Sequence, residues 1–182
     1  MSFEIEIEGL DKHKKEIDHV KPDFVDKKPD LEKIKDAANN HSKENLILIG
    51  NGGSVTSFRA LLYTFMPEVK GHVRIVTTME PDYLNRISKE FDPENTVVMP
   101  ISKSGSTVGV IESLLYFMEK DFPVFAVTSD NEGALRKIVE REGFPWIEHP
   151  EVGGRFSGGT ETALTPAAFM GMDIKEIRAG IE

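Results

Sequence analysis

The sequence predicts an α/β fold, a doubly wound parallel sheet of about five strands flanked by helices. Short apolar runs alternate with longer stretches in which apolar residues recur every three to four positions. Runs of the first kind are typical of strands buried on both faces, and stretches of the second kind are typical of amphipathic helices. Their regular alternation favours parallel pairing through right-handed crossovers.

The expected elements follow in order along the chain. Phe3, Ile5 and Ile7 alternate with glutamates, which predicts a short opening strand, and Asp30 is a candidate N-cap for a helix that begins near Leu31. Inner strands are predicted at residues 46–49, 73–76, 96–99 and 124–127. Core-facing helical stripes are predicted at Phe58, Leu61, Leu62 and Phe65; at Tyr83, Leu84 and Ile87; at Ile111, Leu114, Leu115 and Met118; and at Leu135, Ile138 and Val139.

The C-terminal third completes the expected sheet. Residues 144–147 predict a last strand, which Pro145 restricts to the edge of the sheet because proline cannot donate a ladder hydrogen bond. A glycine-rich stretch at residues 153–159 leads into a predicted helix around residues 163–171, and a short helix is expected from Ile174.

Composition narrows the functional class. The 182 residues carry a net charge of −9, which argues against a nucleic acid or an acidic membrane as partner. There is no cysteine, so disulfides, thiolate catalysis and cysteine-based metal sites are excluded. The first residues do not read as a signal peptide, and no apolar run approaches membrane-spanning length, so we expect a soluble cytoplasmic protein.

Three turns follow expected strands, at residues 50–54, 102–107 and 128–131. Ligands of open parallel sheets bind outside the carboxyl ends of the strands, so these turns are expected at one rim. In the first, Gly52, Gly53 and Ser54 let a ligand approach the backbone at a helix N-terminus. Val55 occupies the place of the third glycine of a dinucleotide fingerprint, and the Walker A ending is missing. A tight turn without a ligand is the alternative.

The second turn is the more specific one. Its hydroxyl-bearing residues are Ser102, Ser104, Ser106 and Thr107, which surround Lys103 and Gly105. A turn needs one glycine and one cap, so this number of hydroxyls favours a phosphate or phosphosugar site over a merely capped helix. The backbone N–H of Lys103 is a candidate donor, whereas its ammonium group could simply be solvated.

The third candidate is Arg155, which stands between glycines at residues 153–159. A guanidinium group remains cationic and can stabilise negative charge that develops on an oxygen. An exposed loop arginine is the alternative.

Together these motifs resemble the sugar isomerase (SIS) domain of the phosphoglucose isomerase (glucose-6-phosphate isomerase) family. The shared motifs are Gly-Gly-Ser at residues 52–54, Ile-Ser-Lys-Ser-Gly-Ser-Thr at 101–107 and Val-Gly-Gly-Arg-Phe-Ser at 152–157. The resemblance implies a flavodoxin-like SIS fold at residues 31–182, preceded by an N-terminal extension at residues 1–30. It corresponds to the N-terminal SIS domain of the family, and the family's second SIS domain is absent from this sequence.

The resemblance also implies residue roles. The 6-phosphate of glucose 6-phosphate or fructose 6-phosphate would be held by Ser102, Ser104, Ser106, Thr107 and the Lys103 backbone. Gly52, Gly53 and Ser54 would line the sugar, and Arg155 would stabilise a cis-enediolate. Ser106 stands where the family usually has threonine. The family's catalytic glutamate, histidine and C-terminal lysine lie in the second domain and match no position here.

Residues within the chain offer few substitutes for those groups. Glu161 follows the arginine loop and is either a carboxylate near the site or a first-turn glutamate that pairs with a helix dipole. His149 is expected as a solvated loop residue, and the histidines show no metal-ligand spacing, so neither a metal nor a cofactor is expected.

Three functional hypotheses remain. The chain is the phosphosugar-binding half of a glucose-6-phosphate isomerase that is incomplete for catalysis alone, a phosphosugar-binding or regulatory module without catalysis, or an autonomous isomerase with Glu161 as its base. The expected partner is a hexose 6-phosphate, and the candidate assemblies are a homodimer or a pairing with a second SIS domain.

Overall fold

The fold is a five-stranded parallel sheet, and the computed structural model describes residues 26–181. The strands are β1 (Asn45–Ile49), β2 (Val73–Val76), β3 (Thr96–Ser102), β4 (Ala126–Thr128) and β5 (Trp146–Glu148). Their spatial order is β2-β1-β3-β4-β5, which is the flavodoxin-like order of doubly wound sheets. The predicted fold class is confirmed, and the strand expected at residues 3–7 lies outside the described residues.

The centre of the sheet is the most completely buried part of the strands. All seven residues of β3 are buried, and β1 pairs with it so that Leu46 is opposite Val97. The fourth strand differs slightly from the prediction, because Val124 forms only an isolated bridge with Val98 and β4 instead runs on to Thr128. The last strand lies at the edge, directly after Pro145, as that residue predicts.

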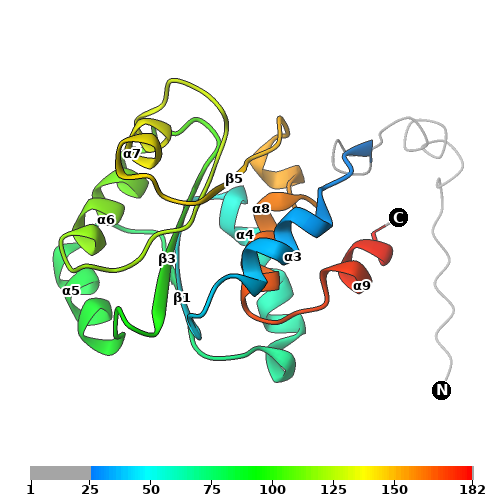
Figure 1. Cartoon of the computed structure of the whole chain (residues 1–182), viewed down its shortest axis with the longest axis horizontal. Coiled ribbons are helices and arrows are strands. Elements are labelled where there is room, and N and C mark those ends of the chain that lie inside the picture. Colours follow the sequence, from blue (N-terminus) through cyan, green and yellow to red (C-terminus); the bar gives the residue numbers. More distant parts are fainter. Residues whose placement is uncertain (1–25, 182) are drawn as a thin grey trace, which may run out of the picture.

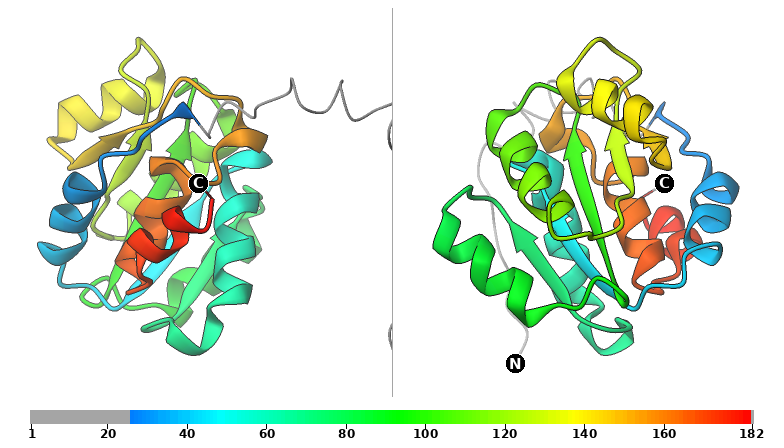
Figure 2. Two further views of the ribbon diagram at one scale, coloured as in Figure 1. Left: turned by 90° about the vertical axis from the view of Figure 1, so that its right-hand side faces the viewer. Right: turned by 60° about the vertical axis from the view of Figure 1, so that its left-hand side comes forward.

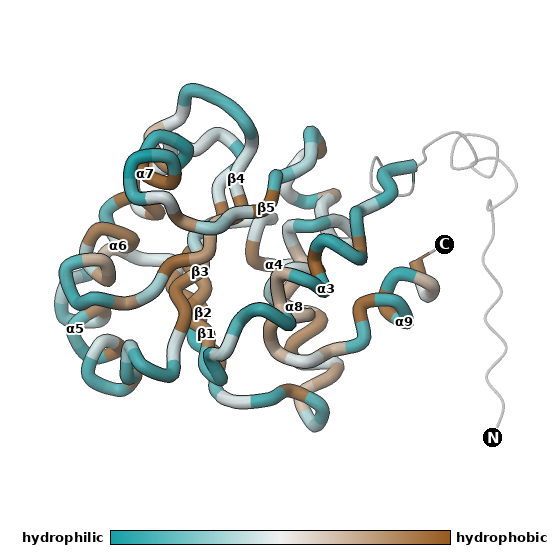
Figure 3. Tube along the Cα trace, in the orientation of Figure 1, coloured by the Kyte–Doolittle hydropathy of each residue, from teal (hydrophilic) through white to brown (hydrophobic). Residues whose placement is uncertain are grey.

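Helices cover both faces of the sheet (Figures 1 and 2). One face is covered by α3 (Leu31–Asn39), α4 (Gly53–Thr64), α8 (Glu161–Phe169) and α9 (Ile174–Ala179). The other is covered by α5 (Pro81–Glu90), α6 (Val108–Met118) and α7 (Ala134–Glu142). Figure 3 shows apolar residues concentrated along the strands and polar residues on the outer helices, as expected for a sheet buried on both faces.

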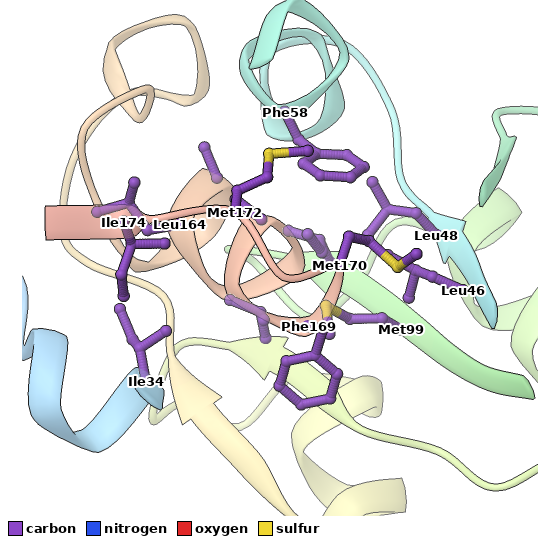
Figure 4. Close-up of a cluster of buried hydrophobic side chains, with 14 of the residues drawn as sticks. Ile34, Leu46, Leu48, Phe58, Met99, Leu164, Phe169, Met170, Met172 and Ile174 are labelled. Carbon is purple, nitrogen blue, oxygen red and sulfur yellow. The ribbon is translucent and has the colours of Figure 1, made fainter. Parts of the chain in front are cut away.

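The core beneath α3, α4, α8 and α9 is rich in methionine (Figure 4). Met99 from β3 and Met170 and Met172 from the segment after α8 pack in this cluster, where unbranched side chains fill irregular gaps. The ring of Phe169 lies 4.8 Å from that of Phe125 and 4.6 Å from the imidazole of His41, measured between centroids. The C-terminal helices are thereby fixed to the sheet.

Local signals decide where the helices begin and which faces they bury. The Asp30 carboxylate accepts a hydrogen bond from the Lys33 backbone N–H at 2.9 Å, which confirms the predicted cap of α3. In α6, Leu114 is fully buried, but Leu115 is 40% exposed because it lies on the outer side of the helix, so that part of the predicted core stripe is wrong.

Over residues 26–181, no helix combines the length and apolarity that a membrane crossing requires.

Candidate functional site

A cavity of about 340 Å³ lies at the carboxyl ends of the strands. It is lined by Asn51, Ser54, Ile101, Ser102, Lys103, Ser104, Thr107, Asn131, Glu151 and Gly154. All three turns that the sequence placed at one rim contribute to it. A larger hollow of about 420 Å³ lies between α3 and the α8–α9 segment, but no strand end contributes to it.

The turn between β3 and α6 forms the hydroxyl-rich wall of the cavity. Ser102 is 3% exposed at the end of β3, and its Oγ lies 3.1 Å from Thr107 Oγ1. Ser104 Oγ accepts a hydrogen bond from the Ser106 backbone N–H at 3.2 Å. Thr107 occupies the N-cap position of α6, yet its side chain makes no capping hydrogen bond. The helix N-terminus therefore keeps donors and a favourable dipole for an anion.

The loop after β4 holds this turn in shape. Asn131 Nδ2 donates to the Lys103 carbonyl oxygen at 2.9 Å, and Asn131 Oδ1 accepts from the Gly133 N–H at 2.8 Å. A Cβ on Gly133 would lie 2.4 Å from the Ser104 carbonyl oxygen, so only glycine permits this approach. The sequence placed Asn131 at the rim but did not predict its role as a clamp.

The turn between β1 and α4 forms the facing wall. Gly52 is the N-cap of α4 with a φ of 57°, and no side chain caps this helix either. A Cβ on Gly53 would lie 2.2 Å from the carbonyl carbon of Gly154, so the start of α4 packs directly on the backbone of the arginine loop. Two helix N-termini without side-chain caps thus border the same cavity.

The sequence-predicted residues are only partly brought together. Those that line the cavity are Ser54, Ser102, Lys103, Ser104 and Thr107, while Gly52 and Gly53 lie beside it at the start of α4. Ser106 is not among the lining residues, and its Oγ donates to the Ser104 carbonyl oxygen at 3.3 Å. Arg155 belongs to a short 3-10 turn, η2 (Gly154–Phe156), and is exposed outside the cavity lining.

Glu151 is a cavity residue that sequence reasoning missed. Its Oε2 lies 3.1 Å from Lys103 Nζ, and the two side chains are 71% and 40% exposed, respectively. They are the two charged side chains among the lining residues. Lys103 is therefore an ion-paired residue rather than an isolated solvated lysine. No signal in the sequence indicated this pair, because it joins loops 48 positions apart, from 103 to 151.

Glu161 lies outside the cavity. Its Oε1 accepts a hydrogen bond from the Asp30 backbone N–H at 3.2 Å, and it lines a separate hollow of about 230 Å³ with Ile147 and Glu148. It stands in the first turn of α8, where a carboxylate interacts favourably with the helix dipole. The alternative reading of Glu161 as a carboxylate near the phosphosugar site is therefore not supported by its position.

His149 corrects an expectation. It is fully buried rather than solvated. Its backbone N–H donates to the Thr128 carbonyl oxygen, so the pairing with β4 continues one residue beyond β5 and holds His149 inside the protein. Its Nδ1 lies 2.8 Å from the Pro150 carbonyl oxygen, and its Nε2 is buried without a partner. Burial lowers the pKa of His149 below its usual value of 6.5. Within residues 26–181, no group of three or more acidic or histidine side chains could hold a metal ion.

Comparisons with known proteins agree with the motifs. The chain is 35% identical over 148 residues to a glucose-6-phosphate isomerase of Thermus thermophilus, across 75% of this chain and 35% of that enzyme. It is 30% identical over 144 residues to the glucose-6-phosphate isomerase of Methanocaldococcus jannaschii, with the same coverages. The chain is homologous to the glucose-6-phosphate isomerases. The family resemblance predicted from its motifs is confirmed, although no family model matches the sequence.

The fold of this glucose-6-phosphate isomerase homologue is also similar to that of solved structures. A hypothetical protein of Thermus thermophilus superposes with a TM-score of 0.82 at 28% identity, over 95% of this chain and 48% of that one. A glucose-6-phosphate isomerase of Chlamydia trachomatis superposes with a TM-score of 0.70 at 18% identity, over 100% and 35%, and shows the shared fold. The chain spans about a third of the length of the curated relatives it matches.

Proposed function

We propose that the cavity binds the phosphate group of a hexose 6-phosphate. The observation that carries the proposal is the turn at residues 102–107. Three of its hydroxyl-bearing residues, Ser102, Ser104 and Thr107, line the cavity beside the N-terminus of α6, a helix without a side-chain cap. Homology to the glucose-6-phosphate isomerases supports the same ligand class. The cavity volume also lies within the range of about 300–1,000 Å³ that is typical of small-molecule sites.

We further propose that the chain is the phosphosugar-binding half of a glucose-6-phosphate isomerase, which interconverts glucose 6-phosphate and fructose 6-phosphate through a cis-enediolate. The phosphate is held by the hydroxyls of Ser102, Ser104 and Thr107 and by the Lys103 backbone. Ser106 joins them only when its hydroxyl leaves the Ser104 carbonyl oxygen. The sugar extends toward Gly52, Gly53 and Ser54 at the start of α4. Arg155 lies outside the cavity lining but directly follows Gly154, which is a lining residue. From this position its guanidinium group would turn toward the cavity and stabilise the enediolate oxygen.

Isothermal titration with fructose 6-phosphate tests the binding site. The wild-type chain is expected to bind, and the double variant Ser104→Ala with Thr107→Val is expected to bind at least about tenfold more weakly, because hydrogen bonds to a charged ligand contribute about 1.5–3 kcal/mol each. Absence of binding by the wild-type chain, or equal binding by the variant, would contradict the proposal.

A second candidate, phosphosugar binding without catalysis by this chain, is favoured by the placement of its carboxylates. Glu151 is the only carboxylate among the lining residues, and it is paired with Lys103, whereas Glu161 lies in another hollow. Proton transfer between C1 and C2 requires a base within hydrogen-bond reach of the substrate.

Incubation of fructose 6-phosphate with the chain in D₂O, followed by NMR, separates the two candidates. Deuterium incorporation at the exchanging carbon supports an isomerase, and binding without incorporation supports a binding module. The variant Glu161→Gln is expected to leave either result unchanged, since its carboxylate lies outside the cavity. A loss of exchange in that variant would instead support the autonomous isomerase.

A further inference from the structure

The charges of the cavity are arranged to cancel each other. Lys103 comes from the turn that carries the hydroxyls, and Glu151 comes from the loop that follows β5. The 3.1 Å distance between Lys103 Nζ and Glu151 Oε2 joins these two segments at the cavity. An incoming phosphate dianion therefore meets a cation that already has a carboxylate partner.

Such a carboxylate is unfavourable for anion binding alone. Like charges within one cavity repel even in an environment close to water, by enough to weaken anion binding several-fold, and a dianion roughly doubles this repulsion. The cost applies to any free anion that enters the hydroxyl-rich turn. Inorganic phosphate can offset only part of this cost, because at neutral pH it keeps one or two P–OH groups as donors and the turn binds it through the same four oxygens.

A phosphosugar differs in what it brings along with the phosphate. Its hydroxyl groups are hydrogen-bond donors, and a carboxylate is an acceptor whose hydrogen bonds are stronger than those of neutral acceptors. Glu151 lines the same cavity as the hydroxyl-rich turn, so a sugar attached to the bound phosphate lies within the same cavity as this acceptor.

We propose that Glu151 is a specificity-determining residue, which favours a hexose phosphate over free inorganic phosphate because it accepts hydrogen bonds from the hydroxyls of the bound sugar. This inference rests on the proposed phosphosugar site. In the free protein the carboxylate neutralises Lys103, and in the complex it exchanges that partner for sugar hydroxyls while Lys103 pairs with the phosphate.

The test compares the affinities of two ligands, inorganic phosphate and fructose 6-phosphate, for the full chain and for Glu151→Gln. Loss of the negative charge is expected to tighten phosphate binding by about threefold to tenfold. Fructose 6-phosphate is expected to gain less, because the amide accepts weaker hydrogen bonds than the carboxylate. The ratio of the phosphate dissociation constant to the fructose 6-phosphate constant should therefore fall at least about threefold.

Two control variants isolate the carboxylate. Glu148→Gln removes an exposed carboxylate three residues away that lines a different hollow, and its affinity ratio should equal that of the wild type. Glu151→Asp retains the charge and should keep most of the wild-type preference for the sugar phosphate. Because the Glu151 side chain is 71% exposed, these substitutions should leave the urea midpoint of unfolding unchanged.

The outcomes separate this inference from the proposed function. If the wild type does not bind fructose 6-phosphate, the proposed phosphosugar site is wrong. If it does bind but the ratio in Glu151→Gln stays within twofold of the wild type, or rises, the role of Glu151 is wrong while the site stands. Undetectable phosphate binding by Glu151→Gln, together with fructose 6-phosphate binding by the wild type, also overturns the role of Glu151.

Discussion

Thr107 connects the fold and the proposed phosphate site through a single hydroxyl. Its Oγ1 lies 3.1 Å from the nearly buried Ser102 Oγ, and it also lines the cavity. Thr107→Val keeps the shape of the side chain but removes the hydroxyl. We expect fructose 6-phosphate affinity to fall about tenfold and the free energy of unfolding to fall by about 1 kcal/mol, because Ser102 loses its partner. Isothermal titration and urea unfolding measure the two effects.

The matched control is Thr64→Val. The hydroxyl of Thr64 donates to the Ala60 carbonyl oxygen at 2.9 Å on an exposed part of α4, outside the cavity. Its removal should leave fructose 6-phosphate affinity unchanged. Loss of stability without loss of affinity in Thr107→Val would show that this hydroxyl serves only the fold.

His41 predicts a pH dependence of stability. Burial lowers the pKa of His41 from 6.5 to about 4, so the unfolded chain takes up a proton before the folded chain does. The stabilising contribution is complete above about pH 6.5 and is lost progressively as the pH falls toward 4. His41→Phe removes the titration, so between pH 7 and pH 4.5 the wild type should lose more free energy of unfolding than this variant.

Urea unfolding at the two pH values provides the measurement. His72→Phe is the control, because His72 is exposed and its replacement should preserve the pH dependence of the wild type. Equal losses in the wild type and in His41→Phe would contradict the assignment. Phenylalanine can retain the ring contact with Phe169, which limits the effect of the substitution on packing.

At the scale of elements, the proposed site depends on a close contact between α4 and the arginine loop. A Cβ on Gly53 would lie 2.2 Å from Gly154 C and 2.4 Å from Arg155 N, and both are backbone atoms. Gly53→Ala must therefore separate the helix start from η2. We expect a loss of about 1–3 kcal/mol in the free energy of unfolding, as for other overpacked sites, together with weaker fructose 6-phosphate binding.

Gly109→Ala provides the contrasting control for urea unfolding and titration. Gly109 lies in the first turn of α6, and its added Cβ would be 3.6 Å from Asn51 Nδ2, an ordinary contact distance. We expect stability that is unchanged or raised by up to about 1 kcal/mol, because alanine is the better helix former. Equal destabilisation by both alanines would argue against the steric explanation at Gly53.

The elements also show what the sequence could predict. Apolar runs marked β1 and β3 because each run is buried on both faces, and Asp30 marked the start of α3 because a cap is a local interaction. The run at residues 73–76 also forms a strand, but β2 lies at the edge of the sheet and three of its four residues are only half-buried, so the expected burial on both faces was wrong there. The precise start of β4 was not predictable in the same way. Its bounds depend on pairing with β3, a strand about 25 positions earlier in the chain.

The candidate site also contains some residues that were predictable from the sequence and others that were not. The hydroxyls of residues 102–107 were predictable because they share one short turn with a helix N-terminus. Asn131 and Glu151 were not, since their contacts with Lys103 join loops that only the folded sheet brings together. The burial of His149 was missed for the same reason, because continued pairing with β4 directs that segment inward.

At the scale of the whole molecule, we expect the folding unit to begin close to residue 30. Among the described residues, Leu31 is the first to pack against a core cluster, and Ile34 is fully buried in that cluster. Asp30 adds two hydrogen bonds: its carboxylate accepts from the Lys33 N–H, and its own N–H donates to the Glu161 carboxylate. These contacts place α3 within the core that α8 and the sheet share. The Leu31 N–H also donates to the Pro29 carbonyl oxygen at 3.0 Å, so the boundary is placed just before Pro29.

A chain comprising residues 29–182 is therefore expected to unfold cooperatively, with a Tm within about 3 °C of the full chain and an affinity for fructose 6-phosphate within twofold. A second truncation, comprising residues 41–182, removes α3 and exposes the surface that Ile34 covers, and it should lose cooperative unfolding. Circular dichroism melts and titrations measure both effects. Failure of the 29–182 chain to fold would mean that the domain requires residues before position 29, and the expected boundary at residue 31 would then be wrong.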